Sequence, residues 1–480
     1  MSTRIQNFIG GEWLAGAGDQ ASSENPSDLA DVIGEYRQAD AQLADQAIAA
    51  ASQAAPAWGE STPQKRFDVL DFIGTELLAR KEELGRLLAR EEGKTLPEAI
   101  GETARAGLIF KFFAGEALRI PGQKLASTRP GVDVEITREP VGVVGAIAPW
   151  NFPLAIPSWK TAPALAFGNA VVLKPAEIVV GCAAALADII GRSGLPKGVF
   201  NLVVGRGSVV GAALLKDRRV AAITFTGSVA TGAEVLRQTT ARGAKVQLEM
   251  GGKNPLVVLA DANLDVAVEC AVQGAYFSTG QRCTASSRLI VEKPVYQEFI
   301  ARAVKRLQSL KVGNALTAGV DIGPVASQSQ LDQNLQYLDI GRKEGGDLLF
   351  GGETLSLANR GHYMQPALIA AKPGDRVSRE EIFGPVASVM PADSYEHALA
   401  LANDTEFGLC SGICTTSLKH ATHFKRHAQA GMVMVNLPTA GVDPHVPFGG
   451  RKGSSYGSRE QGRYAVEFYT TVKTAYTMSG

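Results

Sequence analysis

The stretch VGVVGAIAPWNFPLAIPSWKTAPALAFGNAVVLKPAE, Val141–Glu177, sets the fold class of this chain. An apolar run opens it, a segment with helical spacing continues to Gly168, and a second apolar run ends in KPAE. Further along, GVFNLVVG and AAITFTGS continue the alternation of strands and helices. This alternation is typical of a parallel sheet with helices on both faces. The sequence therefore predicts an α/β protein with a doubly wound parallel sheet.

The segments that flank this region have different patterns. The first hundred or so residues contain helical patterns such as QKRFDVLDFIGTELLARKEELGRLLAREEGK, which we expect to cover the sheet. Val132–Pro140 and the C-terminal EFYTTVKTAYT alternate apolar and polar residues, as an exposed or edge strand does. We expect these two segments to pair as a projecting arm. Its open strand edges would favour assembly with another subunit.

The composition excludes several classes of protein. The chain has 480 residues, of which 45% are hydrophobic and 20% charged, which suits two or more globular domains. The 48 basic and 48 acidic residues balance, so no bulk charge favours nucleic acid or a membrane surface. The N-terminal MSTRIQNFIGGEW lacks a signal-peptide core, and no apolar run is long enough for a membrane span. We expect a cytoplasmic protein.

One cysteine stands out among five that form no disulfide framework, at positions 182, 270, 283, 410 and 414. Cys283 lies in GQRCTASSR, a loop of small residues downstream of an isolated glutamate, Glu249, in LEMGGK. A thiol and a carboxylate delivered in this way suit a nucleophile and its base. The alternative for Cys283 is a buried, inert thiol. We interpret Cys410 and Cys414 as packed thiols.

A third polar side chain follows the first apolar run. Asn151 in PWNFPL could direct its amide N–H at a carbonyl oxygen, which a thiol adding to an aldehyde requires, because the addition creates an alkoxide. The alternative is an ordinary turn residue before Phe-Pro. The sequence thus contains the three groups that thiol addition to an aldehyde needs.

Several motifs are suited to binding a dinucleotide. VVGRGSVVG, Val203–Gly211, approaches the GxGxxG spacing without reproducing it. Lys174 and Glu177 of KPAE could bind ribose hydroxyls, and the helix that opens at Gly227 and Ser228 could bind a phosphate. The alternative is a surface salt bridge together with a helix cap.

Seven motifs together resemble the aldehyde dehydrogenase superfamily: PWNFP, KPAE, FTGS, LEMGGK, GQRC, EEIFGPV and PFGG, in this order along nearly the whole chain. The resemblance implies a Rossmann-type nucleotide-binding domain, an α/β catalytic domain and a small β arm that assembles homodimers or homotetramers. The matching bounds are 1–120 and 141–251 for the NAD-binding domain, 252–455 for the catalytic domain, and 121–140 with 456–480 for the arm.

The resemblance also assigns roles to residues. Cys283 matches the nucleophile and Glu249 the general base, while Asn151 and the backbone N–H of Cys283 match the oxyanion hole. The positions that match the cofactor site are Trp150, Lys174, Glu177, Gly207, Gly227, Ser228, Glu381 and Phe383. A carboxylate at Glu177 would repel a 2′-phosphate, which favours NAD, with NADP as an alternative because Lys174 lies nearby.

No metal is implied by these motifs. His420, His423 and His427 fall near one helical face, where they could be drawn as a metal site. Lysine and arginine are interleaved with them, and no carboxylate or cysteine stands at ligand spacing. We interpret this segment as a solvated helix face.

Motif matching places six residues along the substrate tunnel: Arg105, Phe152, Trp159, Arg282, Val442 and Phe448. Two arginines among aromatic residues would hold an acidic tail through charge-assisted hydrogen bonds. The alternatives are that Arg282 points away from the tunnel and that Arg105 pairs with Glu102 at helical spacing. The predicted reaction is oxidation of an acidic semialdehyde through a cysteine thiohemiacetal, hydride transfer and hydrolysis of a thioester.

A comparison with two groups of semialdehyde dehydrogenases suggests which substrate of that class is oxidised. Succinate semialdehyde dehydrogenases typically have arginines where this chain has Trp159 and Phe277. GQRC and its surroundings look more like the α-ketoglutaric semialdehyde subfamily, which oxidises 2,5-dioxopentanoate to 2-oxoglutarate in sugar-acid catabolism. The alternatives are succinate semialdehyde, a broad substrate range, transfer of the acyl group to coenzyme A, and a silent structural or binding protein.

Overall fold

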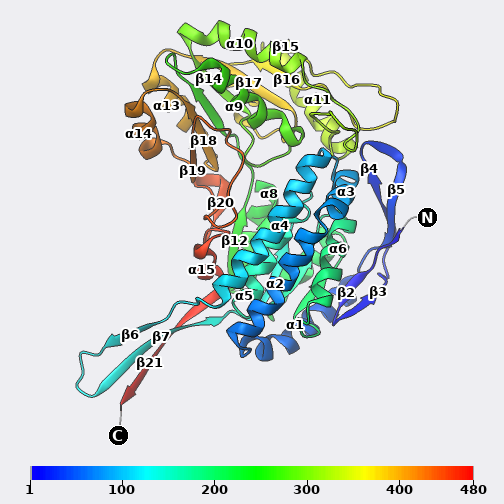
Figure 1. Ribbon diagram of the computed structural model, residues 1–480, viewed down its shortest axis with the longest axis vertical. Helices are drawn as coiled ribbons and strands as arrows, with labels where there is room; N and C mark the ends of the chain where they lie inside the picture. Colours follow the sequence, from blue (N-terminus) through cyan, green and yellow to red (C-terminus); the bar gives the residue numbers. More distant parts are fainter. Residues whose placement is uncertain (1–2, 479–480) are drawn as a thin grey trace.

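The stretch Val141–Glu177 forms the centre of an eight-stranded sheet in the computed structural model, which describes residues 3–478 (Figure 1). β8 (Val143–Ile147) and β9 (Ala170–Lys174) lie side by side in parallel and are buried almost throughout. Helices cover such strands on both faces, which accounts for their continuous apolar runs. The remaining strands are β20 (Ser455–Tyr456), β12 (Lys245–Glu249), β11 (Val220–Thr226), β10 (Phe200–Leu202), β2 (Asn7–Ile9) and β3 (Glu12–Leu14).

The sheet order is β20-β12-β11-β8-β9-β10-β2-β3, and the five strands from β12 to β10 are parallel. The predicted doubly wound parallel sheet is therefore confirmed. The edge strands β20 and β3, and β2 between β10 and β3, are antiparallel additions that the strand–helix alternation did not reveal. The helices of this half are α1 (Ala41–Gly59), α2 (Pro63–Ala79), α3 (Lys81–Glu92), α4 (Leu96–Ala117), α5 (Ala155–Ala166), α6 (Val180–Arg192), α7 (Ala212–Lys216) and α8 (Val229–Thr240).

A second, seven-stranded sheet forms the other large layer of the molecule, in the order β15-β16-β17-β14-β13-β18-β19. All its pairs are parallel except that of β15 with β16. Its strands are β13 (Pro255–Val258), β14 (Arg288–Glu292), β15 (Asp347–Phe350), β16 (Ala367–Ala370), β17 (Val386–Ala392), β18 (Cys410–Cys414) and β19 (Met432–Val435). Its helices are α9 (Leu264–Tyr276), α10 (Lys293–Gln308), α11 (Gln328–Lys343), α12 (Arg376–Arg379), α13 (Tyr395–Asn403) and α14 (Leu418–His427).

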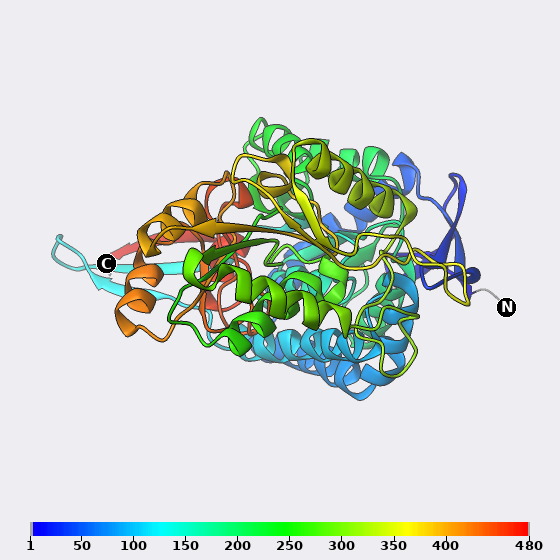
Figure 2. The same cartoon turned by 90° about the horizontal axis from the view of Figure 1, so that it is seen from above.

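A three-stranded antiparallel arm projects from the body, and Figure 2 shows it extending well beyond the helices. β21 (Thr470–Met478) pairs with β7 (Val132–Pro140) along its whole length, after the short helix α15 (Val466–Tyr469). The predicted pairing of these two distant segments is confirmed. β7 is the central strand, however, because β6 (Gln123–Ala126) pairs with its other edge. All residues of β6 are exposed, so no apolar alternation marked this strand.

A further small sheet near the N-terminus consists of β1 (Thr3–Arg4), β5 (Asp28–Arg37) and β4 (Gln20–Asn25), in the order β1-β5-β4. No sequence pattern predicted this sheet. Across residues 3–478, no helix combines the length and the apolar character needed to cross a membrane.

Candidate active site

The ends of four neighbouring parallel strands bring the site motifs together. Ile147 of β8 pairs with Lys174 of β9 and with Phe225 of β11, and Thr226 pairs with Glu249 of β12. Ligands of open α/β sheets bind outside the carboxyl ends of the strands. The loops after these strands carry the WNFP, KPAE, TGS and MGGK motifs, so motifs far apart in sequence meet at one edge of the sheet.

A cavity of about 220 Å³ lies at this edge of the sheet. It is lined by seven residues that the sequence analysis assigned to the site, namely Trp150, Asn151, Gly227, Ser228, Cys283, Glu381 and Phe383. Other lining residues were not predicted: Pro149, Ile156, Thr226, Met250, Gly251, Gln330 and Gln333. Gln330 and Gln333 lie on α11, where nothing in the sequence distinguished them from exposed polar residues. Lys174, Glu177, Gly207, Glu249 and the six predicted tunnel residues lie outside this lining.

The loop that carries Cys283 is fixed by side chains from other elements. Asn254 donates to the backbone oxygens of Cys283 at 2.7 Å and of Ala285 at 3.0 Å, and Thr439 donates to that of Thr284 at 2.6 Å. Burial, together with the charges of Glu249 and Glu381, raises the pKa of the Cys283 thiol to about 12. The thiol is therefore protonated near neutral pH, and its use as a nucleophile requires a base.

Glu249 is a buried carboxyl group at the end of β12, only 2% exposed. Its Oε2 accepts a hydrogen bond of 2.6 Å from the Ser455 hydroxyl. Burial raises the pKa of Glu249 well above its ordinary value, and the charge of Glu460 adds to the effect, whereas Ser455 and Lys160 oppose it. A buried carboxyl group with a raised pKa is suited to accept and release a proton.

Asn151 lies at the junction between the two large sheets and is 4% exposed. Its Nδ2 donates to the backbone oxygen of Gln281 at 2.9 Å, two residues before Cys283. An amide nitrogen carries two N–H groups, so this bond orients the amide and leaves one N–H for a ligand. The amide and the thiol line the same cavity.

Glu381 and Phe383 shape the far side of the cavity. Glu381 accepts a 2.7 Å hydrogen bond from the Gly252 N–H, and burial raises its pKa to about 7. A Cβ atom on Gly251 would lie 2.0 Å from Glu381 Oε2, so a larger residue there would displace the Glu381 carboxyl group. Phe383 has a positive φ of 62° and packs edge-on against Trp150, with 5.4 Å between ring centroids. Such strained residues cluster at ligand sites.

The other predicted cofactor residues differ in burial and in whether they line the cavity. Lys174 is only 6% exposed, and its Nζ donates to the Pro175 oxygen at 2.9 Å and lies 3.9 Å from Glu177 Oε1. This buried lysine differs from the surface salt bridge of the alternative interpretation. Ser228 caps the N-terminus of α8, as that interpretation held, and also lines the cavity. Gly207 opens a short π-helical turn and is not in the cavity lining.

Three predicted tunnel residues form a chain of contacts. Trp159 and Phe448 pack with their ring centroids 5.2 Å apart, and the Arg105 guanidinium lies 5.9 Å from the Trp159 ring. Phe448 belongs to an apolar cluster that also includes Val442 and Cys283. The aromatic wall therefore extends from Arg105 to the nucleophile.

Arg105 is held by Gln461, to whose Oε1 its Nη2 donates at 3.2 Å. It does not pair with Glu102, which bonds Lys94 instead. Within residues 3–478, three buried donor nitrogens near each other have no hydrogen-bond partner: Arg105 Nε, Trp159 Nε1 and Gln461 Nε2. Buried donors without partners are rare and unfavourable, so this cluster is suited to an acceptor from outside the chain.

The remaining predicted tunnel residues face other partners. Arg282 donates through Nη2 to the backbone oxygen of Gln273 on α9, so part of its guanidinium is directed toward that helix. The Phe152 ring lies beneath the Lys94 ammonium, 3.9 Å from ring centroid to Nζ. No cluster of three or more His, Cys, Asp or Glu side chains suited to a metal ion occurs between residues 3 and 478.

Comparison with protein families matches residues 13–475 to the aldehyde dehydrogenase family. This chain belongs to that family. The resemblance drawn from seven ordered motifs is thereby confirmed, and the protein is an aldehyde dehydrogenase by sequence and by fold. The Cys410 and Cys414 side chains of this aldehyde dehydrogenase are buried free thiols, as predicted.

Three relatives show which members of the family this chain is similar to. The chain is 45% identical to an alpha-ketoglutaric semialdehyde dehydrogenase of Bacillus subtilis, over 98% of this chain and 97% of the relative. It is 40% identical to an alpha-ketoglutarate semialdehyde dehydrogenase of Haloferax volcanii, over 99% of both chains. A betaine aldehyde dehydrogenase of Staphylococcus aureus solved in complex with NAD+ superposes with a TM-score of 0.96 at 32% identity, over 99% of this chain and 95% of that one.

Proposed function

We propose that this aldehyde dehydrogenase oxidises an acidic semialdehyde, foremost 2-oxoglutarate semialdehyde (2,5-dioxopentanoate), to the carboxylate 2-oxoglutarate. The cluster of unpartnered donors at Arg105, Trp159 and Gln461 carries this proposal. A substrate carboxylate would supply the missing acceptors, and its charge would match the buried guanidinium. The names of the Bacillus subtilis and Haloferax volcanii relatives support the same substrate.

In the first step, the Cys283 thiol loses its proton to Glu249 and the sulfur adds to the aldehyde carbon. The carbonyl oxygen becomes an alkoxide, which the free N–H of Asn151 and the backbone N–H of Cys283 stabilise. Each fixed donor of this kind typically lowers the barrier by about 2.7–4 kcal/mol. Because the Cys283 pKa is raised to about 12, the proton acceptor is part of the mechanism.

In the second half of the reaction, loss of hydride from the thiohemiacetal leaves a thioester on Cys283. Glu249 first releases to bulk water the proton that it took from Cys283. It then removes a proton from the water molecule whose oxygen attacks the thioester carbon. The carbon–sulfur bond breaks, and the products are the carboxylic acid and the free thiol. A covalent intermediate thus divides a difficult oxidation into two easier steps.

The cavity fits NAD, which when bound accepts the hydride. Thr226 Oγ1 is buried in the cavity lining without a partner among the described residues, and the α8 N-terminus opens beside it. Gly227 has no room for a side chain, since a Cβ would lie 2.5 Å from the Phe225 ring. We propose the cofactor contacts of Trp150, Lys174, Glu177, Gly207, Gly227, Ser228, Glu381 and Phe383. Glu177 favours NAD over NADP.

We also propose the assembly, the domain bounds and the location of the protein. The exposed arm and its open strand edges favour a homodimer or homotetramer. The sheets support division of the chain near residue 251, although β20 at 455–456 joins the eight-stranded sheet. A cytoplasmic location rests on the sequence features given above. Succinate semialdehyde and a broad substrate range remain alternative functions.

Product analysis tests the proposed reaction. Purified protein, NAD and 2-oxoglutarate semialdehyde should give NADH and 2-oxoglutarate in equal amounts. Added coenzyme A should leave the product unchanged, because Glu249 directs the thioester to water. An acyl-CoA product would replace hydrolysis by acyl transfer, and absence of NADH with any aldehyde would favour a catalytically silent protein.

A further inference from the structure

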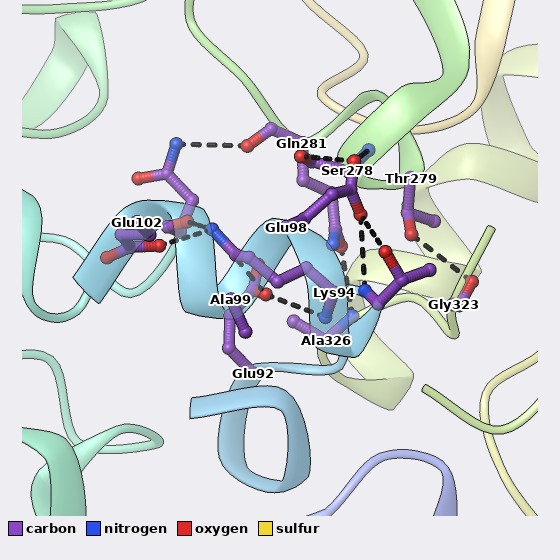
Figure 3. A network of polar contacts seen from close by, with 12 residues as sticks. Glu92, Lys94, Glu98, Ala99, Glu102, Ser278, Thr279, Gln281, Gly323 and Ala326 are labelled. Carbon is purple, nitrogen blue, oxygen red and sulfur yellow. Dashed lines mark hydrogen bonds and ion pairs between the residues drawn. The ribbon is translucent and has the colours of Figure 1, made fainter. Parts of the chain in front are cut away.

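One short segment at the start of α4, Lys94–Glu102, contacts both halves of the proposed catalytic site (Figure 3). The chain leaves α3, turns at Gly93 and enters α4 through a capping box formed by Thr95 and Glu98. None of these residues lines the cavity. Lys94 and Glu102 are buried and, like Glu98, bond backbone groups of other segments, so we expect these side chains to affect the reaction through the residues that they hold.

Lys94 holds the loop that carries Asn151. Its Nζ donates to the Asn151 backbone oxygen at 2.7 Å and to Glu102 Oε2 at 2.6 Å, and it lies over the Phe152 ring. Lys94 is 1% exposed, so water does not compete for these contacts. Hydrogen bonds to charged groups stabilise more than those between neutral groups.

Glu102 extends this hold to the start of α5. Its other oxygen, Oε1, accepts the N–H groups of Leu154 at 3.0 Å and Ala155 at 3.1 Å. These are among the first N–H groups of the helix, which have no partner within it. Lys94 and Glu102 thus fix the segment between Asn151 and Ala155 at its carbonyl, at its aromatic ring and at its helix start.

Glu98 holds the turn that precedes the Cys283 loop. Its Oε1 accepts from the N–H and the hydroxyl of Ser278, at 2.7 and 3.0 Å, while Oε2 accepts from Thr95. Ser278 and Thr279 both have positive φ angles, 50° and 55°. Such conformations are strained and persist only when their surroundings impose them. Glu98 is the charged group that binds this strained turn.

The two held segments meet directly in the site. The Asn151 amide donates to the Gln281 backbone oxygen at 2.9 Å, and the Gln281 side chain accepts the Ala326 N–H at 2.9 Å. The relative position of amide and thiol therefore depends on two loops that share one rigid helix. α4 is 22 residues long; Glu98 lies in its first turn and Lys94 lies two residues before it.

We propose that Lys94 and Glu98 are positioning residues for the addition of Cys283 to the aldehyde. Lys94 places the Asn151 amide, Glu98 places the loop of Cys283, and α4 fixes the distance between them. The inference rests on the proposed roles of Cys283 and Asn151. A displacement of about 1 Å from a change outside the chemistry can lower a rate by roughly 100-fold.

Two substitutions give different expected results. Lys94→Met should lower kcat/KM by about 10- to 100-fold for 2-oxoglutarate semialdehyde and for butanal alike, because both need the Asn151 amide. Alkylation of Cys283 by iodoacetamide creates no alkoxide, so its rate should stay within about twofold of the wild-type rate. Glu98→Ala should change the alkylation rate itself, by about fivefold or more, as the Cys283 loop relaxes. Glu98→Gln keeps an acceptor for Ser278 and should restore most of the activity.

Control variants with the same charge changes distinguish a displaced catalytic group from a less stable protein. Lys81→Met and Glu82→Gln change the same charges at exposed sites on α3 and should leave both rates unchanged. The proposal is overturned if Lys94→Met and Glu98→Ala lower the unfolding temperature without changing kcat/KM or alkylation. Lys94→Gln retains a donor for the Asn151 carbonyl and should keep most of the activity. If Lys94→Met does not fold, Glu98→Ala gives the test: wild-type kcat/KM together with wild-type alkylation in this variant overturns the proposal.

Asn151→Ala and Cys283→Ala are measured in parallel to test the underlying function. Asn151→Ala should lower kcat/KM at least as much as Lys94→Met, and Cys283→Ala should remove activity and alkylation. If either keeps the wild-type rate, the proposed function fails. If both behave as expected but Lys94→Met matches the wild type, only the inference about α4 fails.

Discussion

Ser455 donates its hydroxyl to Glu249, with 2.6 Å between Oγ and Oε2. The two residues face each other across the antiparallel pair formed by β20 and β12. A strand from the last thirty residues of the chain therefore completes the surroundings of the proposed base. Because a hydrogen bond to a carboxylate favours its charged form, Ser455 lowers a pKa that burial raises.

The first prediction concerns the pH dependence of thioester hydrolysis. Protonated Glu249 cannot accept a proton from water, so hydrolysis should be lost as the pH falls through a pKa that lies above the ordinary carboxyl range. Ser455→Ala should move the midpoint upward by about one pH unit, the value of one hydrogen bond. Single-turnover decay of the acyl-enzyme, measured against pH, reports this midpoint. Ser458→Ala is the control, and an unchanged midpoint in Ser455→Ala would contradict the assignment.

The second prediction concerns Arg105 and Arg282. Arg105→Met should raise KM for acidic aldehydes by roughly 10- to 100-fold, the effect of one charged hydrogen bond, with a far smaller change for neutral aldehydes. Arg282→Met should have a smaller effect, because its Nη2 bonds the Gln273 carbonyl on α9, whereas Arg105 lies against the Trp159 ring with two further donors around it that are unpartnered among the described residues. Steady-state kinetics with succinate semialdehyde and butanal make the comparison. Equal changes in KM for both substrates would remove the carboxylate contact from Arg105.

The third prediction concerns the choice between NAD and NADP. Glu177→Gln removes the negative charge while keeping hydrogen-bonding groups, so kcat/KM for NADP should rise relative to that for NAD by about tenfold or more. Lys174, 3.9 Å away, would then face a 2′-phosphate without a competing carboxylate. Kinetics with both cofactors at saturating aldehyde test this. An unchanged ratio would place the adenosine ribose away from Glu177.

The fourth prediction concerns the arm. Val472 on β21 is 58% exposed, although it is a large apolar residue. If the arm binds another subunit, Val472→Asp buries a charge there, and sedimentation at micromolar concentration should show smaller species than the wild type. Ser356→Asp, in an exposed loop, is the control for added charge. Identical sedimentation of Val472→Asp and wild type would exclude this face of the arm from assembly.

The central sheet was predictable because its strands are buried on both faces. β8 and β9 are continuous apolar runs, and short runs of this kind between helical segments are typical of parallel strands that helices cover on both sides. β2, β3 and β6 were not predictable, because strands of only three or four residues carry no clear period. Their position depends on pairing with strands far away in the sequence.

The sequence motifs identified residues that line the cavity. They did not identify residues that contact those residues from outside the cavity. Asn151, Cys283 and Glu381 line one cavity, as the ordered motifs implied. Lys94 lies in a helical, charged segment that resembles many solvated helices, yet it is buried against Asn151. Only the fold reveals that contact, because the two residues are 57 positions apart.

The most direct test of the substrate claim is kcat/KM with NAD for 2-oxoglutarate semialdehyde, succinate semialdehyde and pentanal. The unpartnered donors around Arg105 predict that both acids exceed pentanal by about tenfold or more, with the five-carbon acid ahead. Pentanal turned over as well as the acids would contradict a carboxylate contact at Arg105 and would leave an aldehyde dehydrogenase of broad specificity.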